Sequence, residues 1–170
     1  MQLTGGQAMA RQLALEGVEV IFGLPGVQLD YAVDGLAREA PDIRFLVTRH
    51  EQATTYMADG YARATGKVGV AMVVPGPGVL NALAGLATAY ASGSPVLLIT
   101  GQAPSAFIGE GRGVLHEIPD QSAILRTLTK WTGIAKRPED VPGVLREAFA
   151  QLASGRPRPV AVELPPDVLA

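Results

Sequence analysis

The feature that most constrains the fold of this 170-residue chain is a pair of uninterrupted apolar runs, VGVAMVV (68–74) and PVLLIT (95–100). A strand with one wet face alternates apolar and polar residues, so an unbroken apolar run predicts a strand buried on both faces. Helical patterns at residues 50–65 and 78–92 flank the runs. Fully buried strands that alternate with helices are typical of a parallel sheet covered on both sides.

The same alternation extends along the whole chain. It predicts an α/β fold: a three-layer α/β/α sandwich with a mainly parallel six-stranded sheet. The expected strands are residues 18–23, 43–47, 68–74, 95–100, 131–135 and 159–164. The expected helices run from a Thr4 cap through 15, then 27–37, 50–65, 78–92, 120–128 and 139–153, with a glycine-rich loop at 101–118. We expect the 43–47 strand to be buried, like its neighbours.

Composition excludes several classes of protein. The chain is 48% hydrophobic and 18% charged, has a net charge of −2 and contains no cysteine. Nucleic acid and anionic membranes are therefore not expected partners, and thiolate metal sites and disulfides are excluded. No basic segment followed by an apolar one opens the chain, and no apolar stretch reaches membrane-spanning length, so we expect a cytoplasmic protein of one domain.

Ligands of such sheets bind beyond the carboxyl ends of the strands, which points to residues 23–27, 48–51, 74–81 and 101–117. Residues 76–81 read G-P-G-V-L-N, close to the dinucleotide-binding pattern G-x-G-x-x-G. Asn81 replaces the third glycine, no acid follows about 20 residues later, and two prolines remove backbone donors. NAD binding is thus a weak alternative to a plain tight turn, although the Asn81 amide can still face a ligand.

Residues 50–54 read H-E-Q-A-T, one histidine short of the zinc-protease pattern H-E-x-x-H. His116 is the other histidine, and two isolated histidines predict no metal site in this chain. Glu51 has two interpretations. It either complements the dipole of its helix, or it is a partly desolvated carboxylate at the ligand edge that suits proton transfer. His50 also has two interpretations, a ligand contact or a surface residue, and we expect the surface role.

Four segments together resemble the pyrimidine-binding (PYR) domain of thiamine-diphosphate enzymes, of the acetolactate synthase, pyruvate oxidase and benzaldehyde lyase type. They are FGLPG (22–26), RHEQATTYMADGYARATGKVGV (49–70), PGPGVLNALAGLATAYASGSPVLLITGQ (75–102) and VELPPDVL (162–169). The resemblance covers nearly all of residues 1–170, and the motifs are specific in combination.

The resemblance implies that Glu51 is the acid–base residue that hydrogen-bonds a ring nitrogen of the aminopyrimidine and promotes proton removal from the thiazolium carbon. It further implies that Pro25 and Gly26 line the pyrimidine, with Pro77, Gly78 and Asn81 nearby. Thiamine diphosphate is then the expected cofactor. The expected reaction is decarboxylation or carboligation of 2-oxo acids, as in acetolactate synthase.

The chain departs from the acetolactate synthase pattern in the loop after ITGQ. Phe-Gln-Glu is usual there and the glutamine contacts cofactor-bound intermediates, whereas this chain has His116-Glu117. His116 is therefore a candidate substrate-side residue that exchanges protons near neutral pH, and a solvent-facing loop histidine is the alternative. The stretch DQSAILRTLTKW is closer to benzaldehyde lyase, so a benzaldehyde lyase-like or oxalyl-CoA decarboxylase-like lyase is the alternative function.

The resemblance also implies a second half of the site. The family binds Mg²⁺ and the diphosphate through a G-D-G…N segment in another domain, and no G-D-G occurs here. We therefore expect either a domain of a longer enzyme or one subunit of a split enzyme, acting as a homodimer or higher oligomer on a 2-oxo acid or aldehyde. FAD is present in some members and absent in others. A non-catalytic dimerisation domain remains a further alternative.

Overall fold

In the computed structural model, which describes residues 3–170, six strands form one sheet in the order β2-β1-β3-β4-β6-β5. Every neighbouring pair is parallel. The strands are β1 (Val20–Leu24), β2 (Arg44–Val47), β3 (Gly69–Val73), β4 (Val96–Gly101), β5 (Trp131–Ile134) and β6 (Val160–Leu164). The expected six-stranded sheet is confirmed, and it is parallel throughout rather than mainly so.

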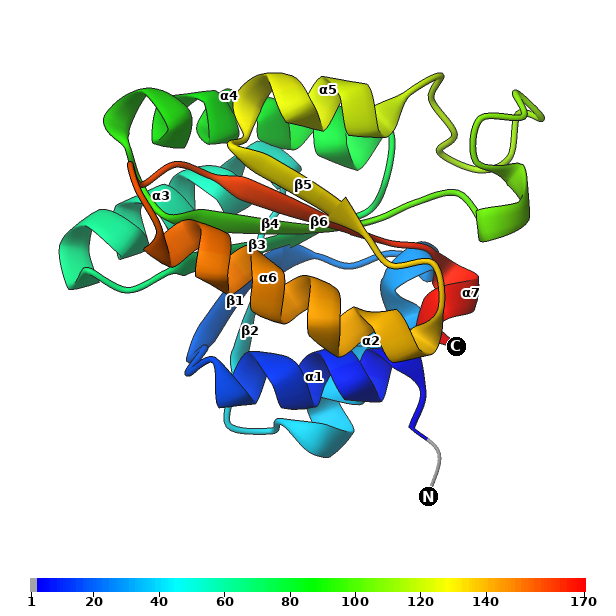
Figure 1. The fold of residues 1–170 in the computed structure, drawn as a ribbon, viewed down its shortest axis with the longest axis horizontal. Coiled ribbons are helices and arrows are strands. Elements are labelled where there is room, and N and C mark those ends of the chain that lie inside the picture. The colour runs from blue at the N-terminus through cyan, green and yellow to red at the C-terminus, as the bar shows by residue number, and fades with distance from the viewer. Residues whose placement is uncertain (1–2) are drawn as a thin grey trace.

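Helices cover both faces of the sheet, which confirms the three-layer sandwich (Figure 1). One layer holds α1 (Gly5–Leu15), α2 (Asp30–Glu39) and α6 (Val141–Ala153), and the other holds α3 (Glu51–Thr65), α4 (Pro77–Ser92) and α5 (Gln121–Leu128). A short helix that the sequence did not predict, α7 (Pro166–Leu169), follows β6. Pro165 follows the end of the strand, and Pro166 starts this helix, since proline suits a first helical turn.

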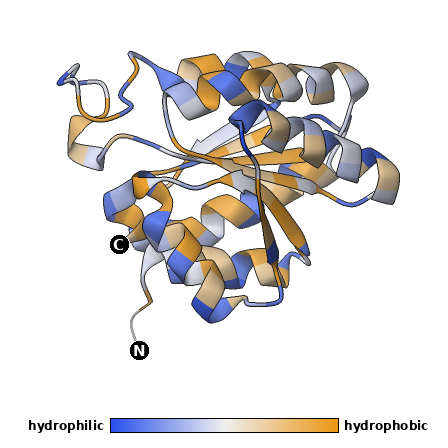
Figure 2. Cartoon of the chain, turned by 180° about the vertical axis from the view of Figure 1, so that it is seen from behind, coloured by the Kyte–Doolittle hydropathy of each residue, from blue (hydrophilic) through white to orange (hydrophobic). Residues whose placement is uncertain are grey.

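The core has two halves because successive side chains of each strand point to opposite layers. Along β3, Val70 and Met72 pack with α1 and α6, whereas Ala71 and Val73 pack with α3 and α4. All five residues of β3 are buried, as are all six of β4. Figure 2 shows these inner strands in the hydrophobic colour, while the helices mix both colours. The unbroken apolar runs are thus strands covered on both sides.

The expectation of a buried strand at residues 43–47 was wrong. β2 lies at the edge of the sheet and pairs only with β1. Three of its four residues are exposed, and Val47 retains 65% of its accessible surface. An apolar run predicts burial on both faces only if helices cover both faces, and that coverage depends on the position of the strand in the sheet.

The helix boundaries follow capping rules that the sequence carries. Thr4 forms a capping box with Gln7 at the start of α1, through bonds of 3.1 and 3.2 Å. Gly66 ends α3 with φ +74°. The 27–37 helix begins instead as a 3₁₀ turn at Val27–Leu29 before α2, and α4 begins at Pro77 rather than at 78.

The small residues of α4 serve packing inside this chain. A Cβ atom on Gly85 would lie 2.3 Å from the Thr55 hydroxyl oxygen and 2.6 Å from the Tyr56 nitrogen. The Thr55 hydroxyl also donates to the Ala82 carbonyl at 2.7 Å. Glycine at 85 therefore lets α3 and α4 cross in backbone contact, and this crossing fixes the position of both helix N-termini.

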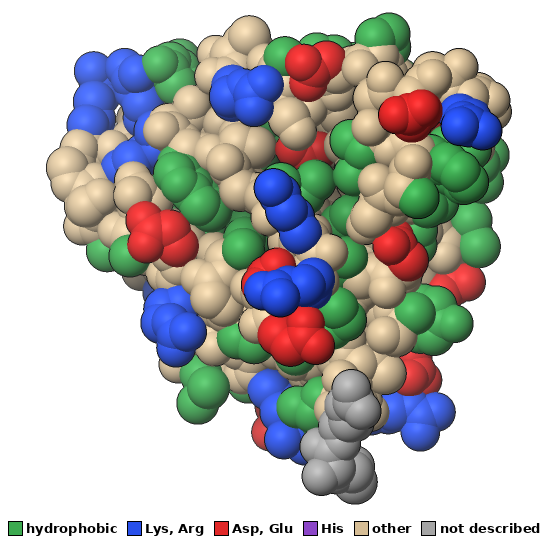
Figure 3. Space-filling model, turned by 45° about the vertical axis from the view of Figure 1, so that its right-hand side comes forward, with side chains coloured by type: hydrophobic (Ala, Val, Ile, Leu, Met, Phe, Trp, Pro, Cys, Tyr) green, Lys and Arg blue, Asp and Glu red, His purple; other side chains and the backbone are tan. Residues whose placement is uncertain are grey.

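The surface carries both signs of charge. On the face drawn in Figure 3, basic and acidic side chains are interspersed. Across residues 3–170, no helix has the length and apolar character that crossing a membrane requires.

Candidate functional site

The carboxyl ends of β1, β3, β4 and β6 lie side by side at one edge of the sheet. Leu24 of β1 is level with Val73 of β3, and Gly101 of β4 is level with Leu164 of β6. Parallel strands present their following loops at the same edge, where open α/β sheets bind ligands. Three of the four segments that the sequence singled out, 23–27, 74–81 and 101–117, follow these strands, and 48–51 follows the edge strand β2.

Glu51 is the first residue of α3, immediately after the edge strand. His50 caps the helix, and its Nδ1 accepts a hydrogen bond from the Gln52 amide at 3.1 Å. His50 is exposed, as expected, whereas Glu51 is partly buried. Thr54, which replaces the second histidine of a zinc site, is buried and donates its hydroxyl to the Glu51 carbonyl at 2.6 Å. Thr54 thus stabilises the first turn of α3.

Asn81 holds the Glu51 side chain. Its Nδ2 donates to Glu51 Oε2 at 3.0 Å, which links the first turn of α3 to the second turn of α4. Glu51 Oε1 has no protein partner among the hydrogen bonds of the described residues. One carboxylate oxygen is therefore fixed, and the other can accept a hydrogen bond from a ligand or exchange a proton with it.

Two glycines and a valine form a small apolar shelf next to Glu51. A Cβ atom on Gly78 would lie 2.7 Å from Val74 Cγ2 and 3.7 Å from Glu51 Cγ. A Cβ atom on Gly26 would lie 2.6 Å from Val74 Cγ1. The chain therefore packs Gly26, Val74 and Gly78 together without side chains between them. Pro25 and Pro77 are the exposed neighbours of this shelf.

His116 lies on a loop that reaches the same edge. Its backbone φ is +64°, a left-handed conformation that is rare for residues other than glycine. Its carbonyl oxygen would be 2.1 Å from a Cβ on Gly76, so glycine at 76 is required by the contact. The ring nitrogen Nδ1 is buried and has no hydrogen-bond partner within residues 3–170.

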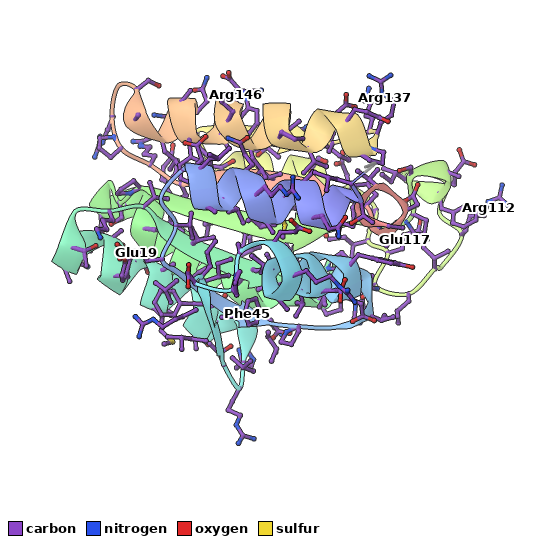
Figure 4. The ribbon with its side chains drawn as sticks, turned by 90° about the horizontal axis from the view of Figure 1, so that it is seen from below. Glu19, Phe45, Arg112, Glu117, Arg137 and Arg146 are labelled. Atoms are coloured by element: carbon purple, nitrogen blue, oxygen red, sulfur yellow. The ribbon has the colours of Figure 1, made fainter. Side chains whose placement is uncertain are left out.

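The glycine-rich loop itself is closed by a carboxylate. Glu117 accepts hydrogen bonds from the Gly111 and Val114 amides at 3.0 and 3.1 Å. Figure 4 shows Glu117 at the base of the loop and Arg112 at its outer end, pointing away from the sheet. Glu117 thus has a structural role, whereas the adjacent His116 has a buried ring nitrogen that lacks a hydrogen-bond partner among residues 3–170.

The structure joins most of the predicted site residues, since Gly26, Gly78, Asn81 and Glu51 connect through contacts with Val74 or with one another. His116 connects through Gly76. Sequence reasoning missed Val74 and a buried polar group behind the turn: Gln28, Gln102, Gln121 and Glu163. One available signal was Glu163, a carboxylate inside the apolar run VAVEL.

The turn at residues 74–78 does not resemble a free phosphate cradle. The Gly76 amide, with φ +57°, donates to Gln121 Oε1 at 2.8 Å and is therefore occupied. The part of the chain that the structure describes contains no group of three or more His, Asp or Glu side chains arranged to hold a metal ion.

Comparison with known proteins identifies a family for this arrangement. Residues 3–124 match the family model described as "Thiamine pyrophosphate enzyme, N-terminal TPP binding domain". This span contains all of the predicted site residues, including Glu51, Asn81 and His116.

Relatives match almost the entire chain. It is 45% identical over 168 residues to the probable 2-ketoarginine decarboxylase AruI of Pseudomonas aeruginosa, covering 99% of the chain and 30% of that relative. It is 41% identical to the acetolactate synthase large subunit of Buchnera aphidicola and 42% identical to the acetolactate synthase isozyme 3 large subunit of Escherichia coli. Each of these alignments covers 98% of the chain and 28% of the relative. The chain thus spans less than a third of the length of the relatives that it matches.

Proposed function

The chain belongs to the thiamine pyrophosphate enzyme family as an N-terminal cofactor-binding domain, and from this premise we propose that it supplies the pyrimidine-binding half of a site that breaks or joins a carbon–carbon bond next to a carbonyl. The observation that carries the proposal is the Glu51 carboxylate. It stands at the sheet edge, partly buried, with one oxygen held by Asn81 at 3.0 Å and the other without a hydrogen-bond partner among residues 3–170.

The residues around Glu51 fit an aminopyrimidine. A flat ring with a basic nitrogen needs a carboxylate at that nitrogen and apolar surface on its faces. Gly26 and Gly78 pack so closely on Val74 that a Cβ atom on either would overlap its side chain, so the surface next to Glu51 Cγ is made of glycine backbone and a valine rather than of larger side chains. We therefore propose that Gly26, Gly78 and Val74 contact the ring, with Pro25 and Pro77 at its rim and Asn81 beside the carboxylate.

Thiamine pyrophosphate supplies, when bound, a thiazolium carbon that adds to a carbonyl and accepts the electrons of the bond that breaks. Glu51 would hold and exchange a proton at the ring nitrogen, which a glutamine could not do because an amide does not titrate. Asn81 would keep the Glu51 carboxylate aimed at that atom, and the apolar shelf would exclude water from it.

His116 is proposed as a substrate-side residue. A non-glycine residue with φ +64° costs of order 1 kcal/mol, and such strain is concentrated at functional sites. The unpaired Nδ1 is a second departure from ordinary packing. A histidine in this place can exchange a proton with a bound substrate near neutral pH. Its proximity to the Gly76 turn places it on the same edge as Glu51.

The names of the relatives support a 2-oxo acid as the substrate class. One is named a 2-ketoarginine decarboxylase and others are named acetolactate synthases, so both decarboxylation and carboligation are candidate outcomes for the whole protein. We propose that Mg²⁺ and the diphosphate bind outside these residues, in a domain supplied in cis or in trans. We further propose that the whole protein forms a homodimer or higher oligomer and is located in the cytoplasm. The absorption spectrum of the purified protein would show whether FAD is bound.

The test uses the full-length protein that contains this chain, loaded with thiamine pyrophosphate and Mg²⁺. Deuterium exchange at the thiazolium carbon is followed by NMR in the wild type and in Glu51→Gln. Loss of a general acid–base group predicts a fall in the exchange rate of at least about 100-fold. Gln52→Ala, a change at the exposed neighbour of Glu51 in α3, is the matched control and should exchange as the wild type does.

The outcomes separate the alternatives. Unchanged exchange in Glu51→Gln rejects the assignment of Glu51. Failure of the wild type to bind thiamine pyrophosphate supports a non-catalytic domain instead. With the assignment upheld, incubation with 2-oxo acids, with and without an acceptor aldehyde, distinguishes carbon dioxide release from carboligation by product analysis.

A further inference from the structure

A carboxylate inside the apolar strand β6 has no role in the site described so far. Glu163 is fully buried, although the residues on either side, Val162 and Leu164, belong to the hydrophobic core. Burying a carboxylate is unfavourable unless donors surround it. Glu163 Oε2 accepts from Gln102 Nε2 at 2.7 Å and from Gln121 Nε2 at 2.9 Å, and Oε1 accepts from the Ser122 hydroxyl.

The carboxylate fixes which way the Gln121 amide points. Because a carboxylate only accepts, the NH₂ group of Gln121 must face it, and the same NH₂ also donates to the Gly101 carbonyl at 3.0 Å. The amide oxygen of Gln121 then faces the opposite direction, where it accepts from the Gly76 amide at 2.8 Å. Gln121 is 2% exposed, so water does not compete for these bonds.

Gly76 is the point where this chain of bonds reaches the site. It is the N-cap of α4, with φ +57° and ψ −112°, and has no side chain with which to cap the helix itself. Its conformation sets the direction in which α4 starts, and α4 carries Gly78 and Asn81. On its other side, Gly76 touches the carbonyl of His116. The position of the α4 residues Gly78 and Asn81 and the position of His116 therefore both depend on the turn at Gly76.

We propose that Glu163 and Gln121 are positioning residues for this reaction. They act through the Gly76 amide and hold both the start of α4 and the His116 segment in the geometry that the cofactor needs. The proposal rests on the proposed function above. It extends the site from the sheet edge into the core, through Gln121 at the first position of α5, to a carboxylate on β6.

The test compares two variants of α5 in the full-length protein. Gln121→Met keeps the length of the side chain and removes its three hydrogen bonds, to Gly76, Gly101 and Glu163. Thr129→Val removes a buried hydroxyl at the other end of α5, which donates to the Leu125 carbonyl at 2.9 Å and bonds Thr132 at 2.8 Å. Both variants should lower Tm, so Tm alone does not discriminate between positioning and general stability.

The discriminating readouts are local. Amide hydrogen exchange of the peptide covering residues 74–81, measured without cofactor, should be roughly tenfold faster in Gln121→Met, since the Gly76 amide loses its hydrogen bond to Gln121. The dissociation constant of thiamine pyrophosphate should rise roughly tenfold, as expected for the loss of one buried hydrogen bond. Thr129→Val should change neither quantity.

Glu163→Gln provides a second route should Gln121→Met fail to fold. It keeps the shape and removes the charge that orients the amide, so it should shift both readouts in the same direction. The proposal would be overturned if Gln121→Met and Glu163→Gln exchanged at the wild-type rate, or if their exchange rates and affinities for thiamine pyrophosphate equalled those of Thr129→Val. Rapid exchange of the Gly76 amide in the wild type would also overturn it. Because the exchange experiment contains no cofactor, it still reports on the link if the wild type fails to bind thiamine pyrophosphate.

Discussion

At the residue scale, the site that we propose depends on two different side chains, a carboxylate and an amide. Glu51 can exchange a proton, whereas Asn81 can only orient it, and the 3.0 Å bond between them leaves one carboxylate oxygen available. A carboxylate in the first turn of a helix also gains from the helix dipole, so placing it there costs little stability. The two interpretations of Glu51, dipole partner and acid–base group, are therefore compatible.

Asn81 can be tested by two substitutions. Asn81→Ala removes the donor to Glu51 and should lower kcat roughly tenfold with a smaller effect on KM, as expected for a lost orienting hydrogen bond. Asn81→Asp places a second carboxylate beside Glu51 and should be more damaging, because like charges repel. Steady-state kinetics of the full-length protein checks both, and an Asn81→Asp variant as active as the wild type would contradict the role of Asn81.

The sequence predicted a role for Glu51, Asn81 and the glycines of the shelf, because their residue types and spacing carry the family resemblance, and the structure brings these residues together. It did not identify Val74, whose contact with Gly26 exists only because β1 and β3 are neighbours. For the same reason it assigned no role to Gln121, which lies 45 residues from Gly76 along the chain. Such contacts follow from strand order, and local pattern does not encode strand order.

At the element scale, the crossing of α3 and α4 decides where Glu51 and Asn81 meet. Both helices begin at the sheet edge, and their backbones touch at Gly85. Small residues on a helix such as α4 permit close approach either of another subunit or of a neighbouring element of the same chain. Buried Ala82, Gly85 and Ala89 face α3 or the sheet, so packing within the chain accounts for these three.

The crossing predicts opposite effects for the same substitution at two helical glycines. Gly85→Ala would place its Cβ 2.3 Å from the Thr55 hydroxyl oxygen and should destabilise the protein by about 1–3 kcal/mol. Gly60→Ala, in an exposed turn of α3 with no atom within 4 Å of the new Cβ, should stabilise it by about 0.5–1 kcal/mol. Chemical denaturation measures both free energies, and a neutral Gly85→Ala would refute the close crossing.

At the scale of the whole molecule, apolar side chains remain exposed on the elements that carry the site. Leu46 and Val47 of β2, Tyr56 and Met57 of α3 and Leu80 of α4 keep between 39% and 65% of their surface. Edge strands with exposed apolar residues normally need cover. Together with the missing diphosphate-binding half, this exposure supports our proposal that another domain or subunit covers this side.

A charged residue introduced on α3 tests whether another subunit packs against this side of the chain. Met57→Lys in the full-length protein should weaken self-association, because a buried interface does not accept an unpaired charge. Ala150→Lys, at an exposed position of α6 in the opposite layer, is the control. Sedimentation velocity across a concentration series should show dissociation of Met57→Lys at concentrations where Ala150→Lys and the wild type remain associated. Equal behaviour of all three would locate the interface elsewhere.

The sequence by itself determined the class of fold, and it singled out Glu51 as the carboxylate on which our proposed chemistry rests. Buried apolar runs alternating with capped helices allow few arrangements other than a parallel sheet between helices, because parallel strands need crossover connections. The tertiary structure decided the rest: that β2 is an edge strand with exposed side chains, that Val74 joins two glycines into a shelf, and that Glu163 reaches Gly76 through Gln121. These features depend on which strands and helices are neighbours. That order is set by packing between residues far apart in the sequence, so a local sequence pattern does not predict it.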